Sequence, residues 1–163
     1  MDDLFAPIGS EWQRVSPRLA TVRRILVLIT AAIAAVIGVA LTMLWSDLAW
    51  IGIVVIVAAV GGAGFGWFWA DRNQRSWGYA ENADDLLVTS GVMFKRLVAI
   101  PYGRMQFVDV QAGPLHRAFG IATVTLHTAS TETAADIPGL SAPEATRLRN
   151  RLTELGEAHG AGL

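Results

Sequence analysis

Residues 25–45 read ILVLITAAIAAVIGVALTMLW, and residues 48–69 read LAWIGIVVIVAAVGGAGFGWFW. Only Ser46 and Asp47 separate the two runs, and neither run holds a charged residue. As an α-helix, each run would be about 32 Å long, which matches the hydrocarbon core of a bilayer. The sequence therefore predicts a transmembrane hairpin with helices at residues 25–45 and 48–69.

The charges that flank the two runs predict the orientation of this hairpin. The turn between the runs holds Asp47 but no Lys or Arg. Cytoplasmic flanks of membrane helices are enriched in Lys and Arg. We therefore expect both termini in the cytoplasm, a location in the cell (inner) membrane, and a cytoplasmic N-terminal segment over residues 1–24. The arginines on which this rests are Arg14, Arg18, Arg23, Arg24, Arg72 and Arg75.

Small residues recur at four-residue spacing in both runs, as in Ala34 with Gly38 and Ala58 with Gly62. In lipid, such faces allow helix backbones to approach closely. The partner of these faces is either the other helix of the hairpin or another subunit, and the sequence leaves both open. Ion and proton pathways usually need ionisable residues inside the membrane, which argues against a channel or transporter formed by this chain alone.

From about residue 76 the pattern changes to short β-rich segments separated by turn residues. Alternating polar and apolar side chains indicate strands, and Val124 with Leu126 are expected to face inward. Ser141 and Glu144 have the spacing of a helix capping box. The expected strands are 77–81, 85–89, 93–100, 106–111, 120–128 and 134–137, the last ended by Pro138 and Gly139.

The last predicted element is an amphipathic helix that follows Ser141. Its apolar stripe consists of Ala145, Leu148, Leu152 and Leu155, at three- and four-residue spacing. Gly156 is a candidate stop, and residues 157–163 are expected to form a flexible tail. An antiparallel sheet followed by one helix predicts a small α+β domain over residues 76–156. Periodicity alone does not distinguish between the different small β-barrel folds that end in such a helix.

Five ordered segments of this domain are similar to the bacterial PH-like domains of the YdbS-like family. The resemblance implies a PH-like antiparallel β-barrel or sandwich capped by a C-terminal α-helix, anchored by a two-helix transmembrane hairpin. It also implies a non-enzymatic module, often found beside a larger membrane protein with several similar domains. It supplies no catalytic or ligand residues. The segments are DLLVTSGV (85–92), IPYGRMQFVDV (100–110), GPLHRAFGIA (113–122), HTA (127–129) and IPGL (137–140).

Four cations are candidates for contact with lipid or with a protein partner: Lys95, Arg96, Arg104 and Arg117. Anionic lipid surfaces attract clusters of such residues. Residues 76–163, however, hold seven Lys or Arg against nine Asp or Glu. This negative balance argues against a strong electrostatic grip on lipid headgroups.

The sequence offers no constellation for catalysis. The chain has no cysteine, and His116, His127 and His159 lack metal-ligand spacing. No phosphate-binding or dinucleotide-binding glycine motif is found. We therefore expect no catalytic residues, no metal, no cofactor and no enzymatic activity.

These features predict a non-catalytic scaffold that docks a protein partner at the cytoplasmic membrane face. The expected contacts are membrane lipids and a protein partner, including a larger membrane protein with similar domains, and no nucleic acid. Association of the chain with itself is a further expectation. Two alternatives stay open: a module that senses lipid headgroups, and a small accessory subunit of a transport or envelope complex.

Overall fold

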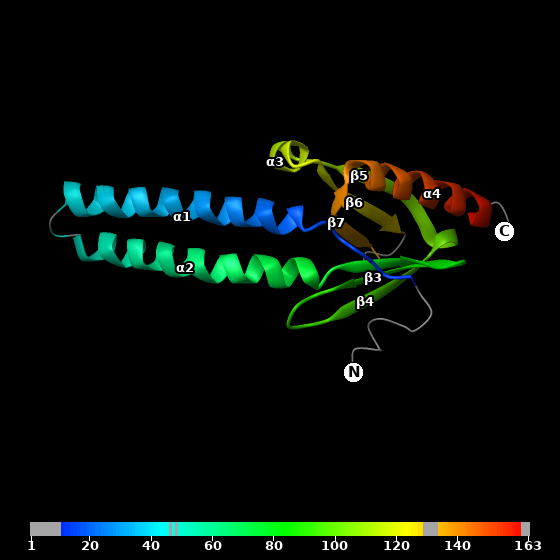
Figure 1. Cartoon of the computed structure of the whole chain (residues 1–163), viewed down its shortest axis with the longest axis horizontal. Coiled ribbons are helices and arrows are strands. Elements are labelled where there is room, and N and C mark those ends of the chain that lie inside the picture. The colour runs from blue at the N-terminus through cyan, green and yellow to red at the C-terminus, as the bar shows by residue number, and fades with distance from the viewer. Residues whose placement is uncertain (1–10, 46, 48, 129–133, 161–163) are drawn as a thin grey trace. The chain divides into compact units, whose positions relative to one another are not determined.

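The computed structural model describes residues 11–45, 47, 49–128 and 134–160. It contains two compact units, shown in Figure 1: a helical pair, residues 20–72, and a head domain formed by the described residues on either side of it. The elements are β1 (Gln13–Arg14), α1 (Arg18–Leu44), α2 (Ala49–Arg75), β2 (Gly78–Glu81), β3 (Asp85–Ser90), β4 (Arg96–Pro101), the 3₁₀ turn η3 (Tyr102–Arg104), β5 (Met105–Gln111), α3 (Pro114–Ala118), β6 (Ile121–Thr128), β7 (Ala135–Ser141) and α4 (Ala142–Gly160).

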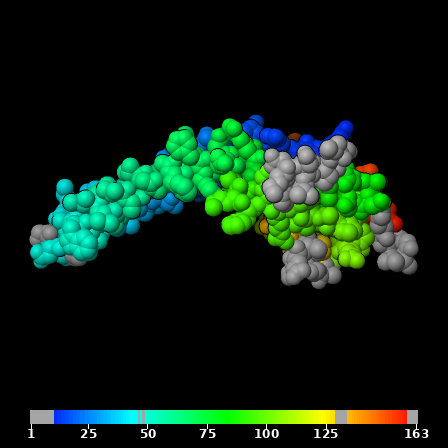
Figure 2. Space-filling view, turned by 90° about the horizontal axis from the view of Figure 1, so that it is seen from below, coloured from blue at the N-terminus to red at the C-terminus, as the bar shows by residue number. Residues whose placement is uncertain are grey.

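Both apolar runs form helices, as predicted, and both helices extend beyond the runs. Each is 27 residues long and is long and apolar enough to cross a membrane. Their large apolar side chains stay exposed. Figure 2 shows the outer surface that α2 forms. Such a surface suits lipid, in which apolar side chains need no burial against protein.

The two helices approach each other closely at two levels. A Cβ atom on Gly38 would lie 2.8 Å from the carbonyl oxygen of Gly52, and one on Gly66 would lie 2.8 Å from Val27. Between these levels, small side chains leave an open apolar groove of about 480 Å³, lined by Val27, Thr30, Ala31, Ala34, Val55, Ala58, Ala59, Gly62 and Ala63. Gly38 therefore serves the contact within the hairpin, whereas Ala34, Ala58 and Gly62 line the groove.

The head domain contains two antiparallel sheets and a covering helix. One sheet has the order β1-β2-β3-β4 and the other the order β5-β6-β7. Val124 and Leu126 are fully buried, as their alternation predicted, and so are Leu148 and Leu152 on α4. The helix packs on η3 and on all three strands of the second sheet, β5, β6 and β7. This is the predicted PH-like sandwich with a C-terminal helix.

The segment before α1 belongs to the head domain, although its sequence pattern did not predict this. Gln13 pairs with Tyr79 and Arg14 with Gly78, so β1 forms the edge of the first sheet. Val15 and Leu19 are buried, and the side-chain amide of Gln74 donates a hydrogen bond to the carbonyl of Val15 at 2.8 Å. The head is thus built from chain on both sides of the helical pair.

Three further predicted element ends were wrong. The strand expected at residues 93–100 begins only at Arg96, because residues 91–95 form the β3–β4 turn around Gly91. Strand β7 does not stop at Pro138 and Gly139 but continues to Ser141. Its register shifts there, because Val124 pairs with Ile137 whereas Ala122 pairs with Leu140. A β-bulge accommodates a proline within a strand. Helix α4 likewise continues past Gly156 to Gly160.

Candidate functional site

One end of the first sheet holds both of its connections to the helical pair. Arg14, Gly78, Thr89 and Leu97 form one row across its four strands. Beyond this row, β1 leads into α1, and the chain from α2 enters β2. The β3–β4 turn, residues 91–95, extends past the same row. We call this part of the head the junction end.

Three of the four candidate cations lie at the junction end. Lys95 and Arg96 are exposed where the β3–β4 turn enters β4. Arg117 is exposed on α3, two residues before Phe119, whose carbonyl accepts a hydrogen bond from Arg18 at 3.3 Å. Since Arg18 begins α1, this bond places α3 beside the chain's exit to the helical pair.

Arg104, the fourth candidate cation, lies at the opposite end of the sheet. It ends η3, which follows the last residue of β4, whereas Arg96 is the first residue of that strand. Six strand residues span about 20 Å. The structure therefore brings Lys95, Arg96 and Arg117 to one end of the head and leaves Arg104 at the other.

The two ends of the head carry different sets of charged residues. The opposite end carries Asp84 and Asp85 beside the β2–β3 turn, and Glu157 in the last turns of α4. At the junction end, Asp136 on β7 lies near Arg96. The two residues line a cavity of about 170 Å³ together with Trp77. The cations of the junction end are Arg14, Arg18, Arg75, Lys95, Arg96 and Arg117. Arg104 also lies at the opposite end, and Asp109 is level with Asp136 on the second sheet, so both ends carry acidic and basic groups.

A polar network joins the first sheet to α4. Arg147 forms salt bridges with Glu144, at 2.7 Å, and with Glu81 on β2. The Tyr79 hydroxyl donates a hydrogen bond to Glu144 at 2.7 Å and lies 2.6 Å from the side-chain amide of Gln13. The network therefore ties β1, β2 and α4 together.

The network also perturbs the titration of its members. Hydrogen bonds from Arg147 and then from Tyr79 hold the pKa of Glu144 below its usual value, although burial opposes this shift. Burial, followed by the hydrogen bond to Glu144, raises the pKa of Tyr79. Burial is also the main cause that raises the pKa of Tyr102 to about 12. These groups stabilise the fold and each keeps one charge state at neutral pH. Their shifted pKa values are explained by packing and hydrogen bonding within the fold.

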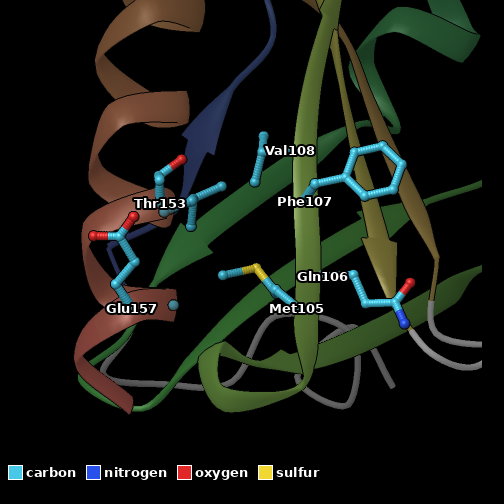
Figure 3. A pocket seen from close by; sticks show the side chains of 8 residues that line it. Met105, Gln106, Phe107, Val108, Thr153 and Glu157 are labelled. Atoms are coloured by element: carbon cyan, nitrogen blue, oxygen red, sulfur yellow. The ribbon is translucent and has the colours of Figure 1, made fainter. Parts of the chain in front are cut away.

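A groove separates the edge strand β5 from α4, and Figure 3 shows the side chains that line it. Its volume is about 210 Å³. Met105 and Val108 point from β5 toward the helix, while Phe107 points the other way. A register shift between Met105 and Phe107 allows two residues three apart to share one side. The lining residues are Met105, Gln106, Phe107, Val108, Leu152, Thr153, Gly156 and Glu157.

The histidines have no shared site in the structure. His127 stacks on Phe107, with ring centroids 4.1 Å apart, and His116 lies on α3. The side chain of His159 is outside the described part of the chain, as is the predicted tail from residue 161 onward. Among the described residues, no group of three or more His, Asp or Glu could hold a metal ion.

Sequence reasoning missed three features that matter most here. Gln13 and Arg14 form too short a strand to produce a periodic pattern. The groove depends on Gly156, which the sequence suggested as a helix stop. The junction end depends on strand register, which decides which turns lie at the same end of the sheet. Register cannot be read from the amino-acid composition of the strands. The Ser141–Glu144 spacing was a usable signal, since Ser141 accepts from the Glu144 amide at 3.4 Å, although the Glu144 carboxylate turns to Tyr79 and Arg147.

Comparison with known proteins agrees with this architecture. The chain is 34% identical over 82 residues to the UPF0699 transmembrane protein YdbS of Bacillus subtilis (strain 168). That alignment covers 50% of this chain and spans about half the length of the relative. No solved structure gives a significant match. A model of the bacterial PH domain matches residues 18–156, which include both long helices, strands β2 to β7 and most of α4. This membrane protein therefore belongs to the bacterial PH domain family.

Proposed function

We propose that this protein is a non-catalytic adaptor that binds an extended segment of a partner protein along β5, in the groove beside α4. The observation that supports this proposal best is that a groove lies next to an edge strand. Strand β5 pairs with β6 on one side and ends the described sheet on the other. An extended peptide can add to such an edge through main-chain hydrogen bonds, and side-chain pockets then supply specificity.

The chemistry of the groove defines the partner segment. Met105, Val108 and Leu152 supply an apolar floor, and Gly156 leaves space where a larger residue would fill it. Because side chains of a strand alternate, one apolar residue of the segment would enter the groove while its neighbours face away. Glu157 lies on the rim and favours a basic residue at that point. The expected ligand is thus an extended segment with an apolar anchor and a Lys or Arg nearby.

The membrane anchor supports a partner that is itself held at the same membrane. With the arginine-rich flanks inside, the head lies in the cytoplasm at the inner membrane face. Two membrane-held chains meet at a raised effective concentration, so a small groove suffices for binding. A larger membrane protein with similar domains fits this requirement, and so does a second copy of this chain. The partner that we propose is a different protein.

Site-specific photo-crosslinking in native membranes tests this function. A photoreactive amino acid at Thr153, on the rim of the groove, should capture one protein through a short extended segment. The same amino acid at Arg151, on the far face of α4, is the matched control and should not capture it. Adding Gly156→Leu should abolish the Thr153 product, because the new side chain fills the groove without entering the core.

Three outcomes would contradict the proposal. Equal capture at Thr153 and Arg151 would indicate non-specific contact. Capture that survives Gly156→Leu would place the partner outside the groove. A crosslink confined to a second copy of this chain would replace the adaptor role by self-association.

A second candidate function is recognition of lipid headgroups. Lys95, Arg96 and Arg117 share the junction end, which favours this role more than the net charge of the domain does. Electrostatic recognition would weaken with salt and require anionic lipid. Replacing these three cations by Gln in the full chain, reconstituted with and without phosphatidylglycerol, tests it. Unchanged lipid contact of the head would exclude it.

A further inference from the structure

The β3–β4 turn exposes the two large apolar side chains that stand out most on the head domain. Met93 is 74% exposed and Phe94 is 87% exposed, whereas the core of the same sheet is buried. Water disfavours this exposure, and adjacent exposed apolar groups mark interaction sites on soluble surfaces. Neither residue takes part in the β5–α4 groove.

The backbone of the turn holds these side chains outward. Gly91 has a φ of +100°, and a Cβ atom there would lie 1.9 Å from the carbonyl oxygen of Phe94. The chain therefore folds back tightly at Gly91, and only glycine fits. This tight reversal carries Met93 and Phe94 to the tip of the hairpin, which extends from the head in Figure 1.

The position of the turn identifies what it meets. Thr89 is level with Gly78, and Gly78 is level with Arg14, so the turn extends beyond the row at which the chain passes to and from the helical pair. Lys95 and Arg96 follow Phe94 directly and are exposed. Apolar and aromatic residues beside cations suit the boundary between acyl chains and anionic headgroups.

We propose that Met93 and Phe94 insert into the leaflet adjacent to the head, so that the β3–β4 turn is a third membrane attachment besides α1 and α2. The occupant of this surface is lipid. Insertion is hydrophobic, so it differs from headgroup recognition by the cations and is independent of partner binding at β5. Its consequence is a head held in one orientation on the bilayer, with Lys95 and Arg96 at headgroup level.

The absence of cysteine permits a direct measurement of depth. Single-cysteine variants Met93→Cys and Phe94→Cys of the full chain are spin-labelled and reconstituted in phosphatidylcholine vesicles containing phosphatidylglycerol. Collision rates with oxygen, which concentrates in lipid, and with a water-soluble nickel chelate are then compared. Ala83→Cys is the matched control, because Ala83 is exposed in the β2–β3 turn at the opposite end of the same sheet.

Labels at positions 93 and 94 should show several-fold lower nickel accessibility than the label at position 83, and higher oxygen accessibility, at both low and high salt. Nickel accessibility equal to that of position 83 would overturn the proposal. Shielding from both reagents would also overturn it, because it indicates cover by protein. If one cysteine variant does not fold, the adjacent position carries the test. Gly156→Leu should leave these values unchanged, which separates this result from the adaptor function.

Discussion

The helical pair exposes its large apolar side chains, whereas the head domain buries them. Val36 and Phe68 on the helices are 69% and 79% exposed, whereas Leu86 and Leu126 in the head are fully buried. The helices contact each other through glycine backbones, while the head is held by large side chains and a charged network. Each unit is therefore organised for its own solvent, lipid for one and water for the other.

Against this contrast, the few large apolar side chains that the head exposes are informative. Met93, Phe94 and Phe107 are its large apolar residues that stay exposed among those described. Phe107 stacks on His127 at the outer side of β5, next to the proposed partner strand. Met93 and Phe94 occupy the junction end. Apolar exposure in the head thus coincides with the two surfaces for which we propose contacts.

The largest expected effect follows from disturbing the core of the head at Gly139. This residue has a φ of +75°, and a Cβ atom there would lie 2.7 Å from the Cβ atom of Leu19. Gly139→Ala should lower the stability of the head by about 3 kcal/mol, because strain and overpacking add. Denaturant unfolding of the full chain in detergent measures this. Gly113→Ala, at a φ of −67° and with no atom nearer than 3.7 Å, is the control and should change little.

A smaller effect is expected from the close contact within the helical pair. Gly38→Val should force the helices apart at Gly52 and destabilise the pair by about 2 kcal/mol. Distances between spin labels on the two helices should increase at this level. Gly61→Val is the control, because a Cβ atom at Gly61 has no neighbour within 4 Å. Equal effects of the two variants would show that the pair has no preferred glycine contact.

The smallest effect concerns acid sensitivity, which distinguishes the head from the helical pair. The pKa of Glu144 is lowered on folding, so its carboxylate contributes stability above the ordinary value of 4.5, and this is lost as the pH falls through the lowered pKa. Arg147→Ala should lower stability by about 1 kcal/mol at neutral pH, a modest value because the pair is partly exposed to solvent. It should also flatten the acid dependence of unfolding below pH 4.5.

Arg151→Ala provides the control for this prediction. Arg151 contacts Glu154 at 3.4 Å, and both side chains are well exposed. Its replacement should leave both the stability and the acid slope close to those of the parent chain. A parent-like acid slope in Arg147→Ala would mean that Arg147 is not the main cause of the lowered pKa of Glu144.

The sequence predicted elements well where their pattern is long and local. Two uninterrupted apolar runs, the alternation around Val124 and the stripe through Leu148 and Leu152 each repeat a signal over many residues. The strand β1, the bulge at Pro138 and the helical Gly156 depend on distant partners instead. The four candidate cations could be identified as residues, but whether they share an end of the sheet depends on register, which local patterns do not encode.

The pairing of Gln13–Arg14 with Gly78–Tyr79 has a consequence for biogenesis. These segments lie on either side of both long helices in the sequence, so the sheet closes only when the two flanks emerge in the same compartment. A chain inserted with one span, or with the hairpin half-translocated, would leave Val15 and Leu19 without their places in the core. Pairing of β1 with β2 therefore requires correct insertion of both helices. In a misinserted chain β2 would lack its partner β1, and this exposed edge would be sensitive to protease.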